Sequence, residues 1–249
     1  EQAAIKQTYN SYGDYSGRQV GTERRTPLDA PHDQARRGKS ERPPDFSLSD
    51  KRKIERNMAD DAKQTKLHNS WTLWYDNPRL APEGTSWHDQ LKNLGTFNSA
   101  EEFWSIFNNI QPSSALALNS NYHLFREGIE PTWEDGANKN GGKFVLTLPK
   151  KDAKAGKGDE WWLFTVLAVI GETMDAAGDE VCGCVVSIRK GQDRIALWLK
   201  SCDRKACTEV GARWKKCLEV SNKTSLRYQA HKDAAKSGRS FQNQIRFEV

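Results

Sequence analysis

The sequence predicts an α+β protein in which an antiparallel sheet carries helices on one face. Seven segments alternate apolar and polar residues, which is the period of a half-buried β-strand, and short turns join several of them. Only three segments repeat apolar residues with helical spacing. Many strands with few helices between them favour helices packed on one sheet face, and the other face is then free to bind a ligand.

The predicted strands are short runs rich in Val, Ile, Leu and aromatic residues. They are WTLWY (71–75), YHLFR (122–126), KFVLTL (143–148), CGCVVSIR (182–189), RIALWLK (194–200), SLRYQA (225–230) and QIRFE (244–248). The predicted helices span residues 100–110, 160–173 and 204–219. Ser99 followed by Glu102 is the signature of a capping box at the start of the first helix.

Two of these helices have apolar residues outside the face that a sheet can cover. In the first helix, Trp104 lies about 100° away from Phe103, outside the centre of the apolar stripe. The second helix is apolar nearly all round, so Leu163 and Leu167 point away from the sheet. Either neighbouring loops cover these side chains, or they form an exposed apolar patch that binds a partner helix.

Composition divides the chain of 249 residues into an arm and a domain. All nine tryptophans lie between Trp71 and Trp214, and the first stretch is rich in Arg, Lys, Pro, Ser and Asp. Such a stretch cannot bury enough apolar surface to offset its chain entropy. We therefore expect a flexible, mostly disordered arm over residues 1–65 and a folded domain over residues 66–249.

Charge, cysteines and hydropathy exclude several classes of protein. The net charge of +5 is too small for a broad nucleic-acid wrapper but permits a local phosphate site. The five cysteines lack paired metal-ligand spacing, so we expect no metal and free thiols in a reducing cytosol. No apolar run reaches the ~18 residues that a membrane span needs.

Two tryptophans fall in polar, Gly- and Pro-containing loops, where large apolar residues are unusual. Trp133 precedes Glu134 and Asp135 in IEPTWEDGANKNGGKF (129–144), and Trp87 lies in NPRLAPEGTSWHDQ (77–90). One interpretation is structural, with Trp133 closing the end of the sheet and both acids solvated. The other is a stacking clamp, because aromatic faces attract a flat cation and a carboxylate can accept hydrogen bonds from a guanine edge.

A cationic turn supports the second interpretation. SIRKGQDR places Arg189, Lys190 and Arg194 around one turn, where they could bind the phosphates of a nucleotide. Guanine methylated at N7 carries a positive charge, so the clamp and the acid would both favour it over plain guanine.

Several segments together resemble the eukaryotic initiation factor 4E family, which binds the 7-methylguanosine cap of messenger RNA. They are IEPTWEDGANKNGGKF, TFNSAEEFWSIFNNI, WWLFTVLAVIGE, VCGCVVSIRKGQDRIALW and YQAHKDAAKSGR, and the likeness covers about residues 67 to 249. The resemblance implies a curved eight-stranded antiparallel sheet. Three helices would pack on its convex face, and the cap-binding slot would lie on its concave side.

The resemblance also assigns roles to individual residues. Those implied to bind the base are Trp87, Trp133, Glu134 and Trp198. Those implied to bind the phosphates are Arg189, Arg194 and Lys143. His231 and Lys236 would lie in a flexible C-terminal loop near the second nucleotide. Those implied to bind partners are Ala100, Trp104, Leu163, Phe164 and Leu167.

The implied partners are capped messenger RNA and proteins that dock a Tyr-x-x-x-x-Leu-apolar helix. These proteins are the scaffold factor 4G and the 4E-binding repressors. Three residues depart from the family pattern at this docking face. Thr65 and Lys66 replace a His-Pro pair, and Phe164 replaces an acid. The identity and affinity of the partner therefore stay open.

Three functions remain in competition with recruitment of a scaffold to capped messages. WEDGANKNGGK and GTF resemble the repressive branch of the family, although that branch usually lacks the tryptophan found here at position 87. A protein-interaction module without cap binding and a cap hydrolase are further alternatives. The chain has no G-x-x-x-x-G-K-[ST] phosphate loop and no evident acid cluster for magnesium, so we expect no enzyme and no cofactor. The expected location is the cytoplasm, with the nucleus as a second possibility.

Overall fold

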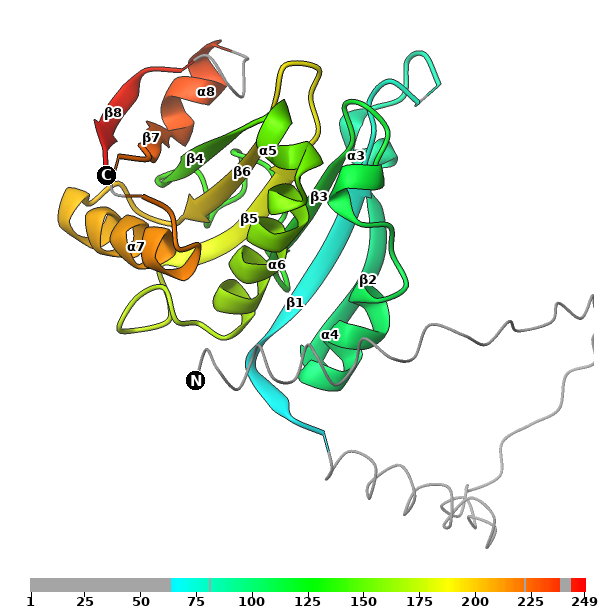
Figure 1. Ribbon diagram of the computed structural model, residues 1–249, viewed down its shortest axis with the longest axis horizontal. Helices are drawn as coiled ribbons and strands as arrows, with labels where there is room; N and C mark the ends of the chain where they lie inside the picture. Colours follow the sequence, from blue (N-terminus) through cyan, green and yellow to red (C-terminus); the bar gives the residue numbers. More distant parts are fainter. Residues whose placement is uncertain (1–63, 81, 222, 238–242) are drawn as a thin grey trace, which may run out of the picture. The chain divides into compact units, whose positions relative to one another are not determined.

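The computed structural model describes residues 64–80, 82–221, 223–237 and 243–249. The predicted arm lies almost wholly outside these residues. Within them, eight strands form one antiparallel sheet with the order β2-β1-β3-β5-β6-β4-β7-β8 (Figure 1). The strands are β1 (Lys66–Asp76), β2 (Lys92–Ser99), β3 (Asn121–Arg126), β4 (Gly142–Pro149), β5 (Val181–Ser187), β6 (Gln192–Leu199), β7 (Arg227–Ala230) and β8 (Ile245–Glu248).

All seven predicted strands are present, but the sequence pattern missed the edge strand β2. Its sequence, KNLGTFNS, contains two large apolar residues and a glycine, because an edge strand needs few buried side chains. Gly95 also has a positive φ of 150°. A Cβ atom there would stand 2.5 Å from Ile106 Cδ1, so the glycine lets the following helix approach the strand closely.

In the part of the chain that the structure describes, the three predicted helices are present with shifted ends, and four shorter helical segments accompany them. The main helices are α4 (Ala100–Phe107), α6 (Lys157–Ile170) and α7 (Arg204–Cys217). The shorter ones are α3 (Trp87–Gln90), α5 (Lys150–Lys154), α8 (His231–Ser237) and the 3-10 turn η1 (Ser113–Ala115). Within the described ranges, no helix combines the length and the apolar character needed to cross a membrane.

The predicted cap of α4 is confirmed in its first half. Ser99 Oγ accepts a hydrogen bond from the Glu102 amide at 3.2 Å. The Glu102 carboxylate reaches back to the Asn98 amide at 2.9 Å, one residue earlier than the usual reciprocal bond. Just before the sheet begins, the Thr65 amide donates to Glu101 Oε2 at 2.9 Å. These contacts fix the start of β1 against the first turn of α4.

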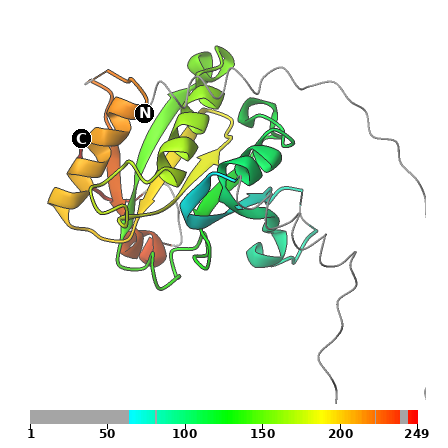
Figure 2. The same ribbon diagram turned by 90° about the horizontal axis from the view of Figure 1, so that it is seen from below.

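Side chains alternate between two faces of the sheet, and the main core lies on the helix side. In β4, Phe144 and Leu146 belong to that core, whereas Val145 belongs to a small cluster on the opposite face. Figure 2 shows α6 and α7 on one side of the sheet and α8 on the other. Inside the core, Trp214 Nε1 of α7 donates to Thr165 Oγ1 of α6 at 2.9 Å, which ties these two helices together.

The expectation of an exposed patch around Trp104 is wrong for two of its members. Trp104 and Leu163 are each only 8% exposed and belong to the main core. The Trp104 ring packs on Phe103 and Phe107, at centroid distances of 4.8 and 6.1 Å. Helix α6 contacts η1, α7 and the sheet, so its flanks are covered as well as its inward face. Both side chains are therefore buried, as the alternative interpretation expected.

The remaining residues of the predicted partner face are more accessible. Ala100, Phe164 and Leu167 are half-buried, and the last two pack against the core from outside. Phe164 also lies beside α7, because Cys217 Sγ of that helix donates to its carbonyl oxygen at 3.5 Å.

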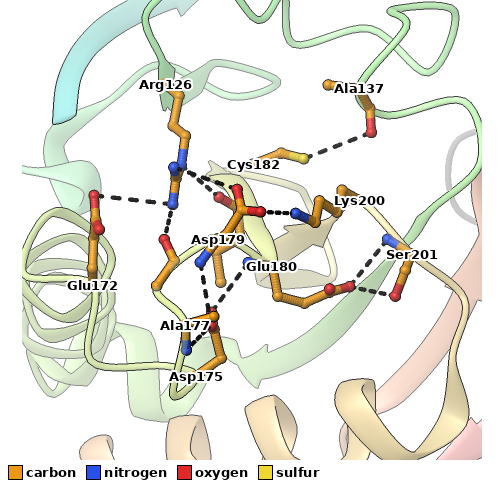
Figure 3. A network of polar contacts seen from close by, with 12 residues as sticks. Arg126, Ala137, Glu172, Asp175, Ala177, Asp179, Glu180, Cys182, Lys200 and Ser201 are labelled. Carbon is orange, nitrogen blue, oxygen red and sulfur yellow. Dashed lines mark hydrogen bonds and ion pairs between the residues drawn. The ribbon is translucent and has the colours of Figure 1, made fainter.

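The segment between α6 and β5, residues 171–180, is fastened to the end of the sheet by a polar network (Figure 3). Arg126 at the end of β3 donates to the carbonyls of Val181 and Gly178. Asp179 accepts a hydrogen bond from Lys200 at the end of β6. The network holds the ends of β3, β5 and β6 together at the end of the sheet opposite the β5–β6 turn.

Candidate functional site

A pocket of about 780 Å³ opens on the sheet face opposite α6 and α7. Both loop tryptophans line it, although they come from segments 46 positions apart, Trp87 and Trp133. The predicted base-binding and phosphate-binding residues all line this same pocket. They are Trp87, Trp133, Glu134, Trp198, Arg189, Arg194 and Lys143. The fold thus brings together the seven residues that the sequence assigned to these two roles.

The wall that carries Trp133 is held by two side chains inside its own turn. Asp135 Oδ1 accepts a hydrogen bond from the Ala137 amide at 2.8 Å, and its Oδ2 accepts one from the Glu130 amide at 3.1 Å. Asn138, fully buried, donates to the carbonyls of Glu130 and Thr132 at 2.9 and 2.8 Å. Asp135 is therefore a structural residue, and the idea that both acids are merely solvated fails for it.

Glu134, unlike the adjacent Asp135, is not engaged by the turn. Its side chain is exposed at the pocket and makes no hydrogen bond or ion pair to another described residue. Its two carboxylate oxygens are therefore available to a ligand that presents two donors.

The wall that carries Trp87 is a single helical turn rather than the expected loop. Ser86 caps α3, with Oγ accepting from the Asp89 amide at 3.3 Å, and α3 contains no buried residue. Gln90 Nε2 donates to the Thr85 carbonyl at 2.9 Å, which closes the segment on itself. The Trp87 ring meets His123 of β3 edge-on at 6.2 Å, and this contact sets its orientation over the pocket.

One polar contact joins the two walls at the mouth of the pocket. His88 Nδ1 lies 3.7 Å from Glu130 Oε2, with side chains 64% and 59% exposed. Exposed pairs of this kind are worth at most about 1 kcal/mol. The contact is therefore a weak link between α3 and the Trp133 turn.

The back of the pocket rests on a buried polar cluster that the sequence analysis missed. Asp76 at the end of β1 is 1% exposed, and its Oδ1 lies 2.6 Å from His123 Nε2. The same oxygen accepts from Asn121 Nδ2 at 2.9 Å. The available signal was the alternation in NYHLFR, which places Asn121 and His123 on the pocket face and Tyr122 and Leu124 on the other.

Arg189 is aimed by neighbours on β3 and by its own turn. Its guanidinium donates to Asn121 Oδ1 at 2.8 Å and to the Ile188 carbonyl at 2.9 Å. The Arg189 amide donates to Asp193 Oδ1, also at 2.9 Å. These bonds fix the cation at the end of β5 while it still faces the pocket.

Three cations converge at this end of the pocket and repel one another. Burial, followed by the charge of Arg194, lowers the pKa of Lys143 to about 8. Burial followed by the charge of Arg189 lowers the pKa of Arg194 to about 10. The pKa of Arg189 is also lowered by burial, against the opposing charges of Asp76 and Asp193. Crowded and partly desolvated cations are poised to gain from an anionic ligand.

The floor of the pocket is Trp198, which is 5% exposed. Lys143 Nζ lies 5.5 Å from the centre of its ring, a cation–π distance. Phe125 meets it edge-on at 5.3 Å.

The structure corrects the predicted positions of His231 and Lys236. Both belong to helix α8 rather than to a flexible loop. His231 is 1% exposed and packs on Trp198 with ring centroids 4.1 Å apart. Burial and then the Lys143 charge lower the pKa of His231 to about 3, so the ring is neutral and supports the floor from behind. Lys236 is exposed and does not line the pocket.

Fold and pocket together define a class of protein: a helix-backed antiparallel sheet whose open face carries a pocket lined by two tryptophans, an acid and clustered cations. Residues 66–246 match the family model of eukaryotic initiation factor 4E. The chain belongs to the eukaryotic initiation factor 4E family.

Relatives and solved structures agree with this assignment. Eukaryotic translation initiation factor 4E-1 of Schizosaccharomyces pombe is 46% identical over 173 residues, covering 69% of this chain and 78% of that protein. The protein of the same name from Arabidopsis thaliana is 43% identical over 178 residues, covering 71% and 72%.

Two solved structures are similar as well. One is C. elegans eIF4E-3 in complex with the 4E-binding protein Mextli and a cap analog, with a TM-score of 0.66 and 33% identity over 75% of this chain and all of that one. The other is Ascaris suum eIF4E-3 with the m7G cap, at the same TM-score and identity, covering 75% and 98%.

Proposed function

We propose that this chain binds the 7-methylguanosine 5′ cap of messenger RNA and recruits a scaffold partner to start translation. The observation that carries the proposal is the convergence of Trp87, Trp133, an unengaged Glu134 and three cations in one pocket. No other described part of the chain combines two aromatic walls, a free carboxylate and clustered positive charge.

Each element has a role in this proposal. The faces of Trp87 and Trp133 stack on the methylated base, whose positive charge strengthens stacking by roughly 0.5–2 kcal/mol per ring. Glu134 accepts the two hydrogen bonds that the guanine edge can donate. Trp198, at the floor, lies near the methyl group. Arg189, Arg194 and Lys143 bind the phosphates.

The relatives support this assignment and its activating form. The C. elegans and Ascaris suum proteins were each solved in complex with a cap or cap analog. The relatives from Schizosaccharomyces pombe and Arabidopsis thaliana carry the name translation initiation factor. We therefore place recruitment to initiation ahead of a repressive role, and Trp87 at the first stacking position agrees with that order.

For the partner, we propose an amphipathic helix of a 4G-type scaffold or a 4E-binding repressor. The C. elegans relative was solved with a 4E-binding protein. Ala100, Phe164 and Leu167 form the accessible part of the predicted docking face. With an aromatic ring in place of an acid at position 164, the face favours a partner helix with an apolar residue there. The proposed role is non-catalytic and cytoplasmic.

The test compares three ligands by tryptophan fluorescence. 7-Methyl-GTP should quench and bind at least tenfold more tightly than GTP, because only the methylated base carries the charge that the rings attract. Equal affinities for the two nucleotides would contradict the proposal.

Arg189→Ala should weaken binding of 7-methyl-GTP by roughly 1.5–3 kcal/mol while leaving binding of 7-methylguanosine nearly unchanged. Equal losses for both ligands would exclude Arg189 as a phosphate ligand.

A further inference from the structure

A second basic surface begins where the phosphate end of the pocket stops. It consists of three exposed lysines, Lys190 in the β5–β6 turn and Lys151 and Lys154 on helix α5. We name this surface the lysine ridge. We propose that the lysine ridge binds the phosphate backbone of the RNA that follows the cap, independently of its sequence. This inference rests on the proposed function, because the cap fixes which end of the RNA reaches the ridge.

One carboxylate places the two halves of the ridge side by side. Asp193 Oδ1 accepts a hydrogen bond from the Arg189 amide at 2.9 Å and pairs with Lys150 Nζ at 2.6 Å. The start of α5 is therefore tied to the turn that carries Arg189. Lys190 follows Arg189 directly, so the ridge adjoins the positive charge of the pocket. Figure 1 shows α5 beside the β5–β6 turn at one end of the sheet.

The ridge lysines keep their charge uncompensated. Among the described residues, none of the three forms an ion pair, whereas the acids around them are already engaged. Asp193 is paired with Lys150, and Asp152 lies 3.8 Å from Lys157. Asp159 keeps its negative charge but is held at η1, where it accepts hydrogen bonds from Ser113 and Ser114. The ridge thus presents net positive charge, which attracts a polyanion.

Several other exposed cations of the domain are paired with acids. On α7, Arg213 pairs with Glu209 at 2.6 Å. Beside α8, Arg246 makes two hydrogen bonds to the Asp233 carboxylate, at 2.9 and 2.8 Å. The ridge lysines differ from these paired cations, and they also adjoin the turn that carries Arg189.

The chemistry of the ridge indicates what it can and cannot read. Lysine ammonium groups contact phosphate oxygens as point charges, and the three ridge positions are all lysines. Aromatic side chains, on which unpaired bases stack in sequence-tolerant readers, are not part of the ridge. We therefore expect an electrostatic contribution that falls steeply with salt and does not depend on base identity.

The test measures the affinity of the full chain for 7-methyl-GTP and for a capped, unstructured decanucleotide over a series of salt concentrations. The triple variant Lys151→Ala, Lys154→Ala, Lys190→Ala should bind 7-methyl-GTP within twofold of the wild type. Its affinity for the capped decanucleotide should fall roughly tenfold at low salt. The slope of log affinity against log salt should decrease by about 2, because each lost phosphate contact on a single strand contributes ~0.7.

A matched control removes the same charge elsewhere. Lys205→Ala, Lys216→Ala, Lys223→Ala alters three exposed lysines on α7 and the segment after it. This variant should retain wild-type affinity for both ligands. An equal loss in the control and ridge variants would reduce the effect to overall net charge and overturn the proposal.

Two other outcomes would also overturn it. The wild type could bind the capped decanucleotide no more tightly than 7-methyl-GTP, in which case cap binding stands and the ridge plays no part. Alternatively, Lys232→Ala, Lys236→Ala on α8 could weaken the decanucleotide while the ridge variant does not, which would mean that the RNA leaves across α8. Failure of the wild type to bind 7-methyl-GTP at all would reject the proposed function, and the ridge inference with it.

Discussion

The two aromatic walls of the pocket perform one task but are built differently. The Trp133 wall is a turn closed from within by buried Asn138 and by Asp135, which together make four hydrogen bonds to the backbone of the turn. The Trp87 wall is one turn of exposed helix, α3, with no buried residue and a single side-chain cap. Segments with few buried contacts open at low free energy. The comparison indicates a fixed wall at Trp133 and a yielding wall at Trp87.

The largest expected effect concerns the rings themselves. Trp133→Ala and Trp87→Ala each remove one stacking face, so each should weaken 7-methyl-GTP by about 2 kcal/mol or more. Calorimetric titration of both variants measures the losses. We expect similar values, because stacking depends on the ring and not on its support. A folded Trp133→Ala variant with wild-type affinity would refute the assignment of the pocket.

The next effect separates the two acids of the fixed wall. Glu134→Gln should weaken the cap by roughly 1.5–3 kcal/mol, the worth of a charged hydrogen bond, and should leave the unfolding midpoint unchanged. Asp135→Asn should chiefly lower the unfolding midpoint and cost less affinity than Glu134→Gln, because its amide group would face backbone N–H groups whose hydrogen bonds the carboxylate now accepts. Titration and urea unfolding of both variants give the four values. A larger loss of cap affinity in Asp135→Asn than in Glu134→Gln would contradict the assignment of Glu134 as the ligand-binding acid and Asp135 as the structural one.

A matched pair of amide side chains tests the difference in support. Asn138→Ala strands two carbonyl groups inside the Trp133 turn, so cap affinity should fall by about 1–3 kcal/mol. Gln90→Ala removes one half-buried hydrogen bond beside Trp87 and should change cap affinity by less than about 1 kcal/mol. Both variants keep every proposed ligand-binding residue. Equal effects would show that the walls are equally rigid.

The smallest expected effect is at the cap of α3. Ser86→Ala removes an exposed N-cap, which is typically worth about 1 kcal/mol to a helix. Because α3 already opens at low free energy, the loss of its cap should change the rate of association with 7-methyl-GTP more than the affinity. Stopped-flow fluorescence measures the rate. An affinity loss as large as that of Asn138→Ala would contradict the yielding wall.

The sequence predicted much of this arrangement, and its failures have physical causes. Period-2 alternation located seven strands, because each buries one face against the helices. It missed β2, an edge strand with little to bury. Helical periodicity placed Trp104 outside the apolar stripe of its helix and so predicted that it is exposed. Periodicity identifies only one covered face, whereas α4 buries both Phe103 and Trp104. The pocket residues came from the resemblance to a family. The supports Asp76, His123 and Asn138 are polar residues whose partners lie far along the chain or inside a turn.

Lys143 has a consequence for how binding exchanges protons with the solvent. Its pKa of about 8 means that the ammonium group is only half protonated near that pH. Phosphate groups placed beside it stabilise the charged form and raise the pKa. Binding near pH 8 therefore takes up part of a proton, and affinity declines as the pH rises further. The measured heat of binding then includes the ionisation heat of the buffer, so it should differ between phosphate and Tris at pH 8. In a Lys143→Met variant this difference should shrink.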